Sequence, residues 1–178
     1  GVYDTIQVEV YIKGNLIRVN EFSKGGKLIR SYFANVESGS TYLVSFSNRM
    51  YSKVKVDNSP AISNVSILKS ENYIEINGIR CYQWRVKNLA TQTETTYWVS
   101  ETKYDFAPKL FSALANAGSA IEELVSLPQP EGILPLMVVD RTRFRKLRSN
   151  IRVLSITPMQ ISQTLFTIPV GFNELISS

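Results

Sequence analysis

The chain has 178 residues, of which 44% are hydrophobic and 20% are charged, with 20 Lys and Arg against 15 Asp and Glu and a net charge of +5. This length suits one domain that buries roughly 70% of its unfolded surface. Histidine is absent and cysteine occurs once, which excludes Ser-His-Asp and Cys-His nucleophilic systems, histidine metal sites, thiolate zinc sites and an internal disulfide.

The first hundred residues alternate between apolar and polar side chains, with turn residues between the runs. Ile6, Val8, Val10 and Ile12 share one face of the first run, and Gly14 begins the turn that follows it. Later turns include Asn77-Gly78, the strongest hairpin signal in the chain. The pattern predicts an antiparallel meander over 1–101, with strands near 6–13, 16–22, 27–36, 41–47, 50–56, 64–68, 72–76, 79–86 and 93–100.

The period then changes to that of a helix. Leu110, Leu114, Ile121 and Leu124 recur at helical spacing, and prolines follow at the end of the segment, which predicts one amphipathic helix over 107–127. Gly118 lies inside this segment and is interpreted as a small residue where the helix approaches the sheet closely.

Closing strands are expected over 133–172. The runs 134–141 and 151–157 have strand character, and 165–169 is interpreted as a short edge strand because its proline cannot donate to a central ladder. The predicted fold class is mainly β (α+β), in one domain over 1–178. It is a strongly curved antiparallel sheet, or half-barrel, of about ten strands with the helix on its concave face.

Five cations fall within eight residues between the last two long strands, and the sequence pI is about 9.3. One interpretation is contact with an anionic surface, either nucleic acid or anionic lipid. The other, which we favour from sequence, is a solvated hairpin tip whose charges protect a sheet edge, since the cluster matches no nucleic-acid module. The cations are Arg141, Arg143, Arg145, Lys146 and Arg148.

Aromatic residues concentrate in the central strands. Such residues usually pack a core, but in a curved sheet they could line a ligand cavity. Cys81 falls on the strand face opposite two of them and is expected to be a buried structural thiol. The candidate ligand-lining residues are Tyr73, Tyr82, Trp84, Tyr97 and Trp98.

Catalytic, metal and cofactor motifs are not found in the sequence. There is no calcium loop, dinucleotide fingerprint or P-loop pattern, and the adjacent Glu122 and Glu123 diverge on a helix, so they cannot act as an acid–base pair. We therefore expect no enzyme, cofactor or metal. No apolar run is long enough to span a membrane. No signal-peptide pattern is present, and the start at Gly1 within an expected strand suggests a trimmed N-terminus.

Three motifs carry a family resemblance. The run 77–84 joins Asn-Gly to a strand containing Cys81, the run 96–100 reads Thr-Tyr-Trp-Val-Ser, and the run 165–172 reads Leu-Phe-Thr-Ile-Pro-Val-Gly-Phe. Together they resemble secreted bacterial proteins catalogued as domain of unknown function 4412, similar in architecture to periplasmic lipoprotein carriers of the localisation-factor type. The resemblance implies an exported cell-envelope protein with a curved sheet closed by helical cover, and no catalytic residues. The segment 110–130 departs from the family pattern.

Three functions are consistent with these features. The first is a non-enzymatic cell-envelope binding or carrier-like domain for an apolar ligand such as a lipid or acyl chain. The second is a structural or protein-interaction module with a filled core, which an envelope protein could bind. A basic nucleic-acid-binding protein is a distant third. An apolar cavity of a few hundred cubic ångströms would favour the carrier.

Overall fold

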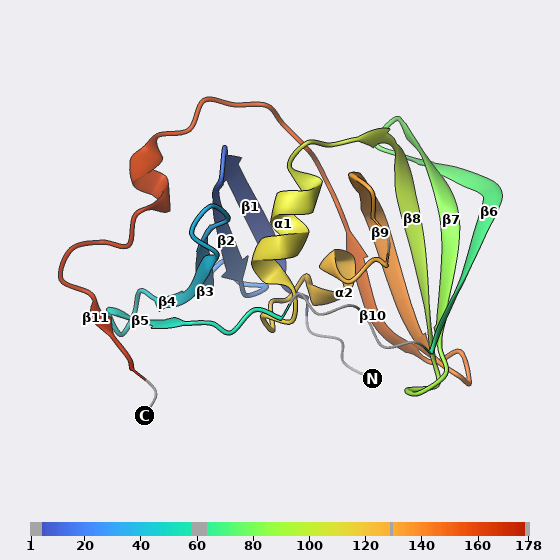
Figure 1. Ribbon diagram of the computed structural model, residues 1–178, viewed down its shortest axis with the longest axis horizontal. Helices are drawn as coiled ribbons and strands as arrows, with labels where there is room; N and C mark the ends of the chain where they lie inside the picture. Colours follow the sequence, from blue (N-terminus) through green and yellow to red (C-terminus); the bar gives the residue numbers. More distant parts are fainter. Residues whose placement is uncertain (1–4, 58–63, 129, 177–178) are drawn as a thin grey trace. The chain divides into compact units, whose positions relative to one another are not determined.

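The computed structural model describes residues 5–57, 64–128 and 130–176, in which there are eleven strands, two α-helices and one 3-10 helix (Figure 1). The strands form two separate sheets of six and five strands, and neither is closed or strongly curled. The mainly β class is thus confirmed. The single half-barrel of about ten strands is wrong, because β5 is bordered by the last strand of the chain and its ladder does not continue into β6.

The chain divides into two compact units, and each is described by itself. The first contains 1–58, 109–122 and 159–178, and the second contains 59–108 and 123–158. The expectation of a single domain over 1–178 stays a prediction. No helix in the described ranges is long and apolar enough to cross a membrane.

The first unit is built on a meander of antiparallel strands. Gly14, with φ of +59°, makes the tight turn between the first two strands, a conformation that glycine adopts without strain. The sheet order is β1-β2-β3-β4-β5-β11, and only β11 runs parallel to its neighbour. The strands are β1 (Gln7–Lys13), β2 (Leu16–Phe22), β3 (Leu28–Asn35), β4 (Ser40–Ser45), β5 (Met50–Lys53) and β11 (Asn173–Glu174).

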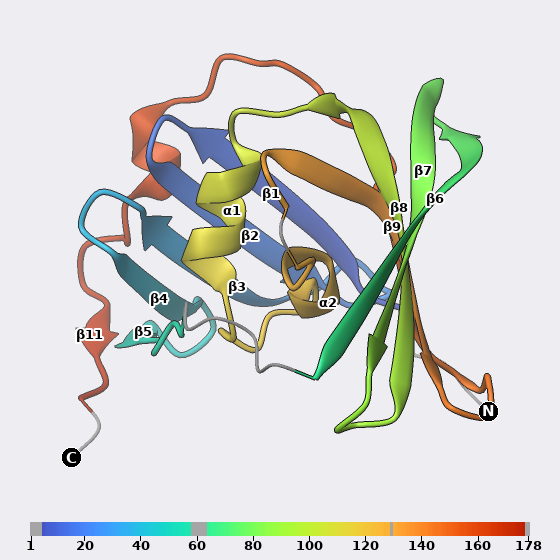
Figure 2. The same ribbon diagram turned by 45° about the vertical axis from the view of Figure 1, so that its right-hand side comes forward.

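One face of this sheet packs against a helical segment (Figures 1 and 2). Ile17, Val19 and Tyr32 share that face and are nearly inaccessible to solvent, as is Leu114 at the end of α1 (Ala107–Leu114). The hydroxyl of Thr41 donates to the carbonyl of Ala113 at 2.8 Å. Leu114, one member of the predicted apolar stripe, is therefore buried where the helical segment meets this sheet.

The single helix predicted over 107–127 is replaced by α1 and the short α2 (Glu122–Val125). Asn116 and Gly118 between them have φ of 54° and 75°, and this left-handed backbone ends the helix. A Cβ added at Gly118 would meet no atom within 4 Å, so the interpretation of Gly118 as a close-approach glycine is wrong. Its carbonyl instead accepts hydrogen bonds from Tyr32 and Arg30 at 3.1 Å each.

A buried carboxylate fixes the segment between α1 and α2 to the sheet. Glu21 on β2 is 1% exposed and accepts a hydrogen bond from the backbone N–H of Ala120 at 2.7 Å. It also pairs with the guanidinium of Arg30 on β3, which faces it across the ladder. Charge and hydrogen bonding are thus both satisfied, as burial of a carboxylate requires.

The C-terminal segment lies along the other face of the first sheet. The guanidinium of Arg18 lies over the rings of Phe33 and Phe46, and its Nη1 donates to the carbonyl of Leu165 at 3.0 Å. The strand expected at 165–169 is wrong. A 3-10 helix, η1 (Gln163–Phe166), occupies this place, because the side chain of Ser162 caps it by accepting from Thr164 N.

The second unit is an antiparallel sheet in the order β10-β9-β8-β7-β6. The two strands expected at 64–68 and 72–76 are one strand with an irregular register between Lys69 and Tyr73, and the predicted Asn77-Gly78 turn has the positive φ at both residues that it needs. Strand β10 ends at Arg152, so 153–157 lies outside it. The strands are β6 (Val65–Ile76), β7 (Ile79–Asn88), β8 (Thr93–Lys103), β9 (Ile133–Thr142) and β10 (Leu147–Arg152).

Candidate functional site

The register of the second sheet places charged residues in a row across three strands. Lys87 on β7 is opposite Glu94 on β8, and Glu94 is opposite Arg141 on β9. Two residues along, Arg85 is opposite Thr96 on the same face. Alternation along each strand therefore projects a cation, a carboxylate and a second cation side by side on one face.

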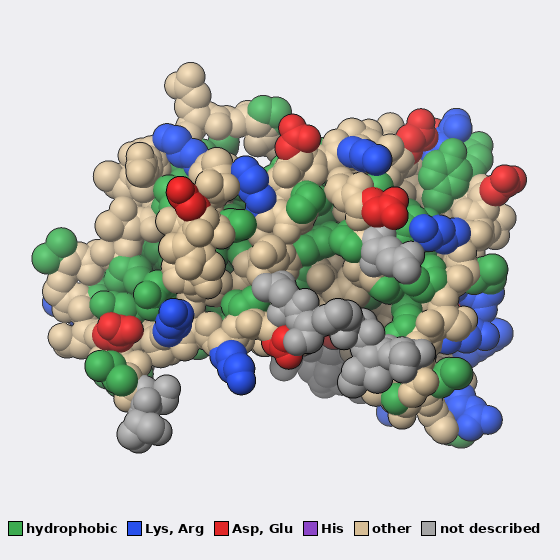
Figure 3. Space-filling model, viewed as in Figure 1, with side chains coloured by type: hydrophobic (Ala, Val, Ile, Leu, Met, Phe, Trp, Pro, Cys, Tyr) green, Lys and Arg blue, Asp and Glu red, His purple; other side chains and the backbone are tan. Residues whose placement is uncertain are grey.

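Beyond this row, two turns extend the surface into an open hollow of about 690 Å³, which we call the basic groove. The turns join β7 to β8 and β9 to β10. Figure 3 shows Lys and Arg side chains gathered at the lower right, over the end of the sheet where these two turns lie in Figure 1. The groove is lined by Gln83, Arg85, Lys87, Asn88, Leu89, Gln92, Thr93, Glu94, Thr96, Arg141, Thr142, Arg143 and Arg145.

The basic groove has five cations and one carboxylate, and the carboxylate is already engaged. Glu94 pairs with Arg85 Nε at 3.1 Å and with Lys87 Nζ at 3.9 Å. Arg141, Arg143 and Arg145 have no carboxylate partner within the described residues. None of these three guanidiniums forms a salt bridge there, and each has the planar fork that binds phosphate or carboxylate groups in pairs of hydrogen bonds.

Local hydrogen bonds order the β9–β10 turn that carries these arginines. Thr142 N donates to the carbonyl of Lys146 at 2.9 Å, and Arg145 N donates to the carbonyl of Thr142 at 2.8 Å. Arg141 Nη1 reaches the carbonyl of Arg145 at 3.3 Å. Arg143 Nη1 donates to Gln92 Oε1 at 3.5 Å, from one turn to the other. The cations are thus presented by a folded hairpin end.

The five cations singled out from the sequence divide between two environments. Arg141, Arg143 and Arg145 line the basic groove, whereas Lys146 and Arg148 do not. Arg148 pairs with the buried carboxylate of Asp140 at 3.2 Å, which gives this arginine a structural partner. The hairpin expected in this run is confirmed by the β9–β10 turn, whereas protection of a sheet edge by its charges stays a prediction.

Sequence reasoning missed the contribution of β7. Arg85 and Lys87 on β7 lie on the same face of the sheet as Glu94 on β8. The strand predicted from the sequence ends at Val86 and so does not include Lys87. The Arg-Val-Lys alternation followed by Glu94 was the available signal. Extending the predicted hairpin by two residues would have placed Lys87 opposite Glu94.

The five candidate ligand-lining aromatics lie on two faces of the second sheet. Tyr73 is paired with Tyr82 and Trp84 with Tyr97 on one face, while Trp98 is paired with Gln83 on the other. Tyr97 is 3% exposed, and the ammonium of Lys69 lies 4.0 Å from the ring centroid of Trp84. None of the five lines either hollow described here, and their ligand-lining role stays a prediction.

Tyr97 and Cys81 are titratable residues of this sheet that are buried and do not line the groove. Burial raises the pKa of the Tyr97 hydroxyl, and the nearby carboxylates of Asp140 and Glu123 raise this pKa further. Burial likewise raises the pKa of the Cys81 thiol, whose side chain is fully inaccessible. Cys81 lies on the face predicted from sequence, with Gln83 and away from Trp84. A neutral, enclosed thiol is unsuited to nucleophilic attack.

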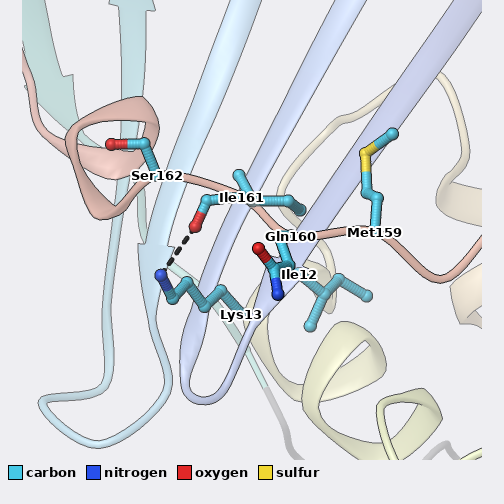
Figure 4. Close-up of a pocket in the computed structure, with 6 residues that line it drawn as sticks. All are labelled: Ile12, Lys13, Met159, Gln160, Ile161 and Ser162. Carbon is cyan, nitrogen blue, oxygen red and sulfur yellow. Dashed lines mark hydrogen bonds between the residues drawn. The ribbon is translucent and has the colours of Figure 1, made fainter.

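The first unit has a smaller hollow at the end of β1, of about 540 Å³ (Figure 4). The side chain of Lys13 extends toward the C-terminal segment, and its Nζ donates to the carbonyl of Ile161 at 2.6 Å. Ile12 and Met159 border the same space. Its cation already has a partner within the chain, so this hollow is a weaker candidate than the basic groove.

Among the described residues, no group of three or more Cys, Asp or Glu side chains is placed to hold a metal ion. Comparison of the chain with family models, curated proteins and solved structures found no match. The resemblance to the domain of unknown function 4412 family therefore stays a prediction.

Proposed function

We propose that this protein is a non-enzymatic binding module that holds an anionic partner in the basic groove. The observation that carries the proposal is a set of three arginines, Arg141, Arg143 and Arg145, that form no salt bridge with any described carboxylate. They face one open hollow together with Arg85 and Lys87. Clustered like charges repel one another. An anionic ligand relieves that repulsion and also accepts hydrogen bonds from the guanidinium N–H groups.

The groove chemistry favours binding over catalysis. Its carboxylate, Glu94, is held in two ion pairs, and the remaining uncharged polar side chains are amides and threonine hydroxyls. No lining residue pairs a nucleophile with a general base. We therefore keep the non-enzymatic assignment as part of the proposal.

The carrier hypothesis has less support from the described hollows. Both are open to solvent, and the larger is lined mainly by charged and amide side chains, which offer an acyl chain no enclosed apolar surface. The second hypothesis from sequence, an interaction module, fits the basic groove better. A cell-envelope location, an apolar ligand and an envelope-protein partner stay predictions.

The test is an isothermal titration calorimetry experiment at low salt, in which the protein is titrated with a short polyphosphate as a soluble polyanion. The triple variant Arg141→Gln/Arg143→Gln/Arg145→Gln removes three groove charges. A matched triple variant, Lys24→Gln/Lys27→Gln/Arg49→Gln, removes the same charge from exposed turns of the first unit. The proposal expects at least tenfold weaker binding in the groove variant alone. Equal weakening by both variants would mean that only net charge matters, and the groove would lose its role.

A further inference from the structure

The two turns that border the basic groove each expose a large apolar side chain. Leu89 in the β7–β8 turn is 68% exposed, and Phe144 in the β9–β10 turn is 90% exposed. Turn tips ordinarily have small or polar residues, and nothing in the local geometry of either turn calls for an apolar side chain. Two such tips at one end of the same sheet form a feature that anion binding alone leaves unexplained.

One side-chain contact joins the two turns, and local hydrogen bonds order each of them. Arg143 in one turn donates to Gln92 in the other, and both turns contribute lining residues to the groove. In the β7–β8 turn, Asn88 Oδ1 accepts from the backbone N–H groups of Ala90 and Thr91 at 3.0 and 3.1 Å. Leu89 and Phe144 are therefore displayed on ordered turns beside a cluster of cations.

Nucleic acid and an anionic bilayer both present an extended anionic surface to such a groove. Single-stranded nucleic acid is held by stacking successive bases on aromatic rings inside a basic groove. Among the described residues no aromatic side chain lines the basic groove, and Phe144 at its border offers a single ring where successive bases need several. An anionic bilayer presents phosphates above an apolar layer. Its phosphates and acyl chains match a groove of cations bordered by exposed apolar side chains.

We propose that the end of the second sheet docks on an anionic lipid surface. Leu89 and Phe144 enter the boundary between headgroups and acyl chains, while Arg141, Arg143 and Arg145 bind lipid phosphates. This inference rests on the proposed function, since it names the anionic partner of the same groove. Charge complementarity selects the anionic surface, and the exposed tips select a bilayer over a soluble anion.

The experiment measures co-sedimentation with vesicles of phosphatidylcholine alone and of phosphatidylcholine mixed with phosphatidylserine. A tip variant, Leu89→Ser/Phe144→Ser, removes both apolar side chains. A control variant, Leu68→Ser/Leu154→Ser, likewise replaces two large apolar side chains with serine, at two exposed residues of the second unit that do not line the groove. All four positions are exposed, so each variant should fold, which an unchanged circular dichroism spectrum verifies.

We expect the unaltered protein to sediment with vesicles that contain phosphatidylserine. With vesicles of phosphatidylcholine alone, it should stay in the supernatant. The tip variant should bind the phosphatidylserine-containing vesicles at least about tenfold more weakly, because its apolar side chains no longer enter the boundary between headgroups and acyl chains. The single variant Phe144→Ser, at the tip that does not line the groove, should keep its polyphosphate affinity. The control variant should match the unaltered protein in both assays.

Different failures identify different errors. Polyphosphate binding without vesicle binding, or full vesicle binding by the tip variant, would overturn the membrane assignment and leave the groove function standing. Tighter binding of a single-stranded oligonucleotide than of polyphosphate, with no vesicle binding, would identify nucleic acid as the partner. Absence of binding to polyphosphate and vesicles alike would refute the proposed function and this inference with it.

Discussion

Replacement of the buried carboxylate of Glu21 tests how the segment between α1 and α2 is attached to the first sheet. Glu21→Ala removes the acceptor of the Ala120 N–H and the partner of Arg30 together. Glu21→Gln is the matched variant, because its amide oxygen can still accept from Ala120 N while the charge is lost.

The expected cost follows from those two contacts. A hydrogen bond to a charged group contributes about 1.5–3 kcal/mol. The ion pair adds little beyond this, because the Arg30 side chain is 38% exposed and water can solvate its guanidinium when Glu21 is removed. We therefore expect Glu21→Ala to lower the free energy of unfolding by about 2–3 kcal/mol, and Glu21→Gln by about 1 kcal/mol.

Urea denaturation measures the global loss, and native-state amide exchange measures the local one. In the unaltered protein the Ala120 N–H should be protected by its bond to Glu21. Protection should fall sharply in Glu21→Ala and only slightly in Glu21→Gln. A loss below about 0.5 kcal/mol together with unchanged exchange at Ala120 would refute the reasoning, since it would place the attachment elsewhere.

Three further predictions follow from burial. Leu114→Ala should cost about 2–5 kcal/mol in a denaturant titration, because the side chain is fully buried, whereas the exposed neighbour Ser112→Ala should be nearly neutral. Above pH 10 the unfolded chain loses the Tyr97 proton while the folded chain keeps it, since the folded pKa is raised. Stability should therefore fall by about 1.4 kcal/mol per pH unit from this group, and Tyr97→Phe should remove that slope. Thiol reagents should label Cys81 slowly in the native protein and rapidly in urea, and equal rates would contradict its burial.

The local parts of the fold were predictable from the sequence. Gly14 and Asn77-Gly78 supply the positive φ that tight hairpins need, and the period-two runs beside them identify the strands. The break in the predicted helix was not predictable from Gly118, because an isolated glycine in a helical pattern is compatible with a continuous helix and with an interrupted one. The helix ends because the backbone is left-handed at Asn116.

The division into two sheets depends on pairings between distant residues, which periodicity does not encode. The edge of β5 that faces away from β4 pairs with β11, which lies more than a hundred residues later in the chain. The same limit applies to the candidate site. The dense run of arginines was visible in the sequence, but its position beside Arg85 and Lys87 follows from the β7–β8–β9 register. Alternation assigns a residue to a face of its strand and leaves the neighbouring strand undetermined.

The salt dependence of polyphosphate binding tests the role of the basic groove most directly. Each cation that neutralises a phosphate releases bound counterions, so the slope of log affinity against log salt counts the contacts, at roughly 0.7–0.9 per cation. Replacing Arg141, Arg143 and Arg145 with Gln should flatten this slope by about 2–3, while the matched variant in the first unit should leave it unchanged. An unchanged slope in the groove variant would contradict the assignment of these arginines as the anion-binding site.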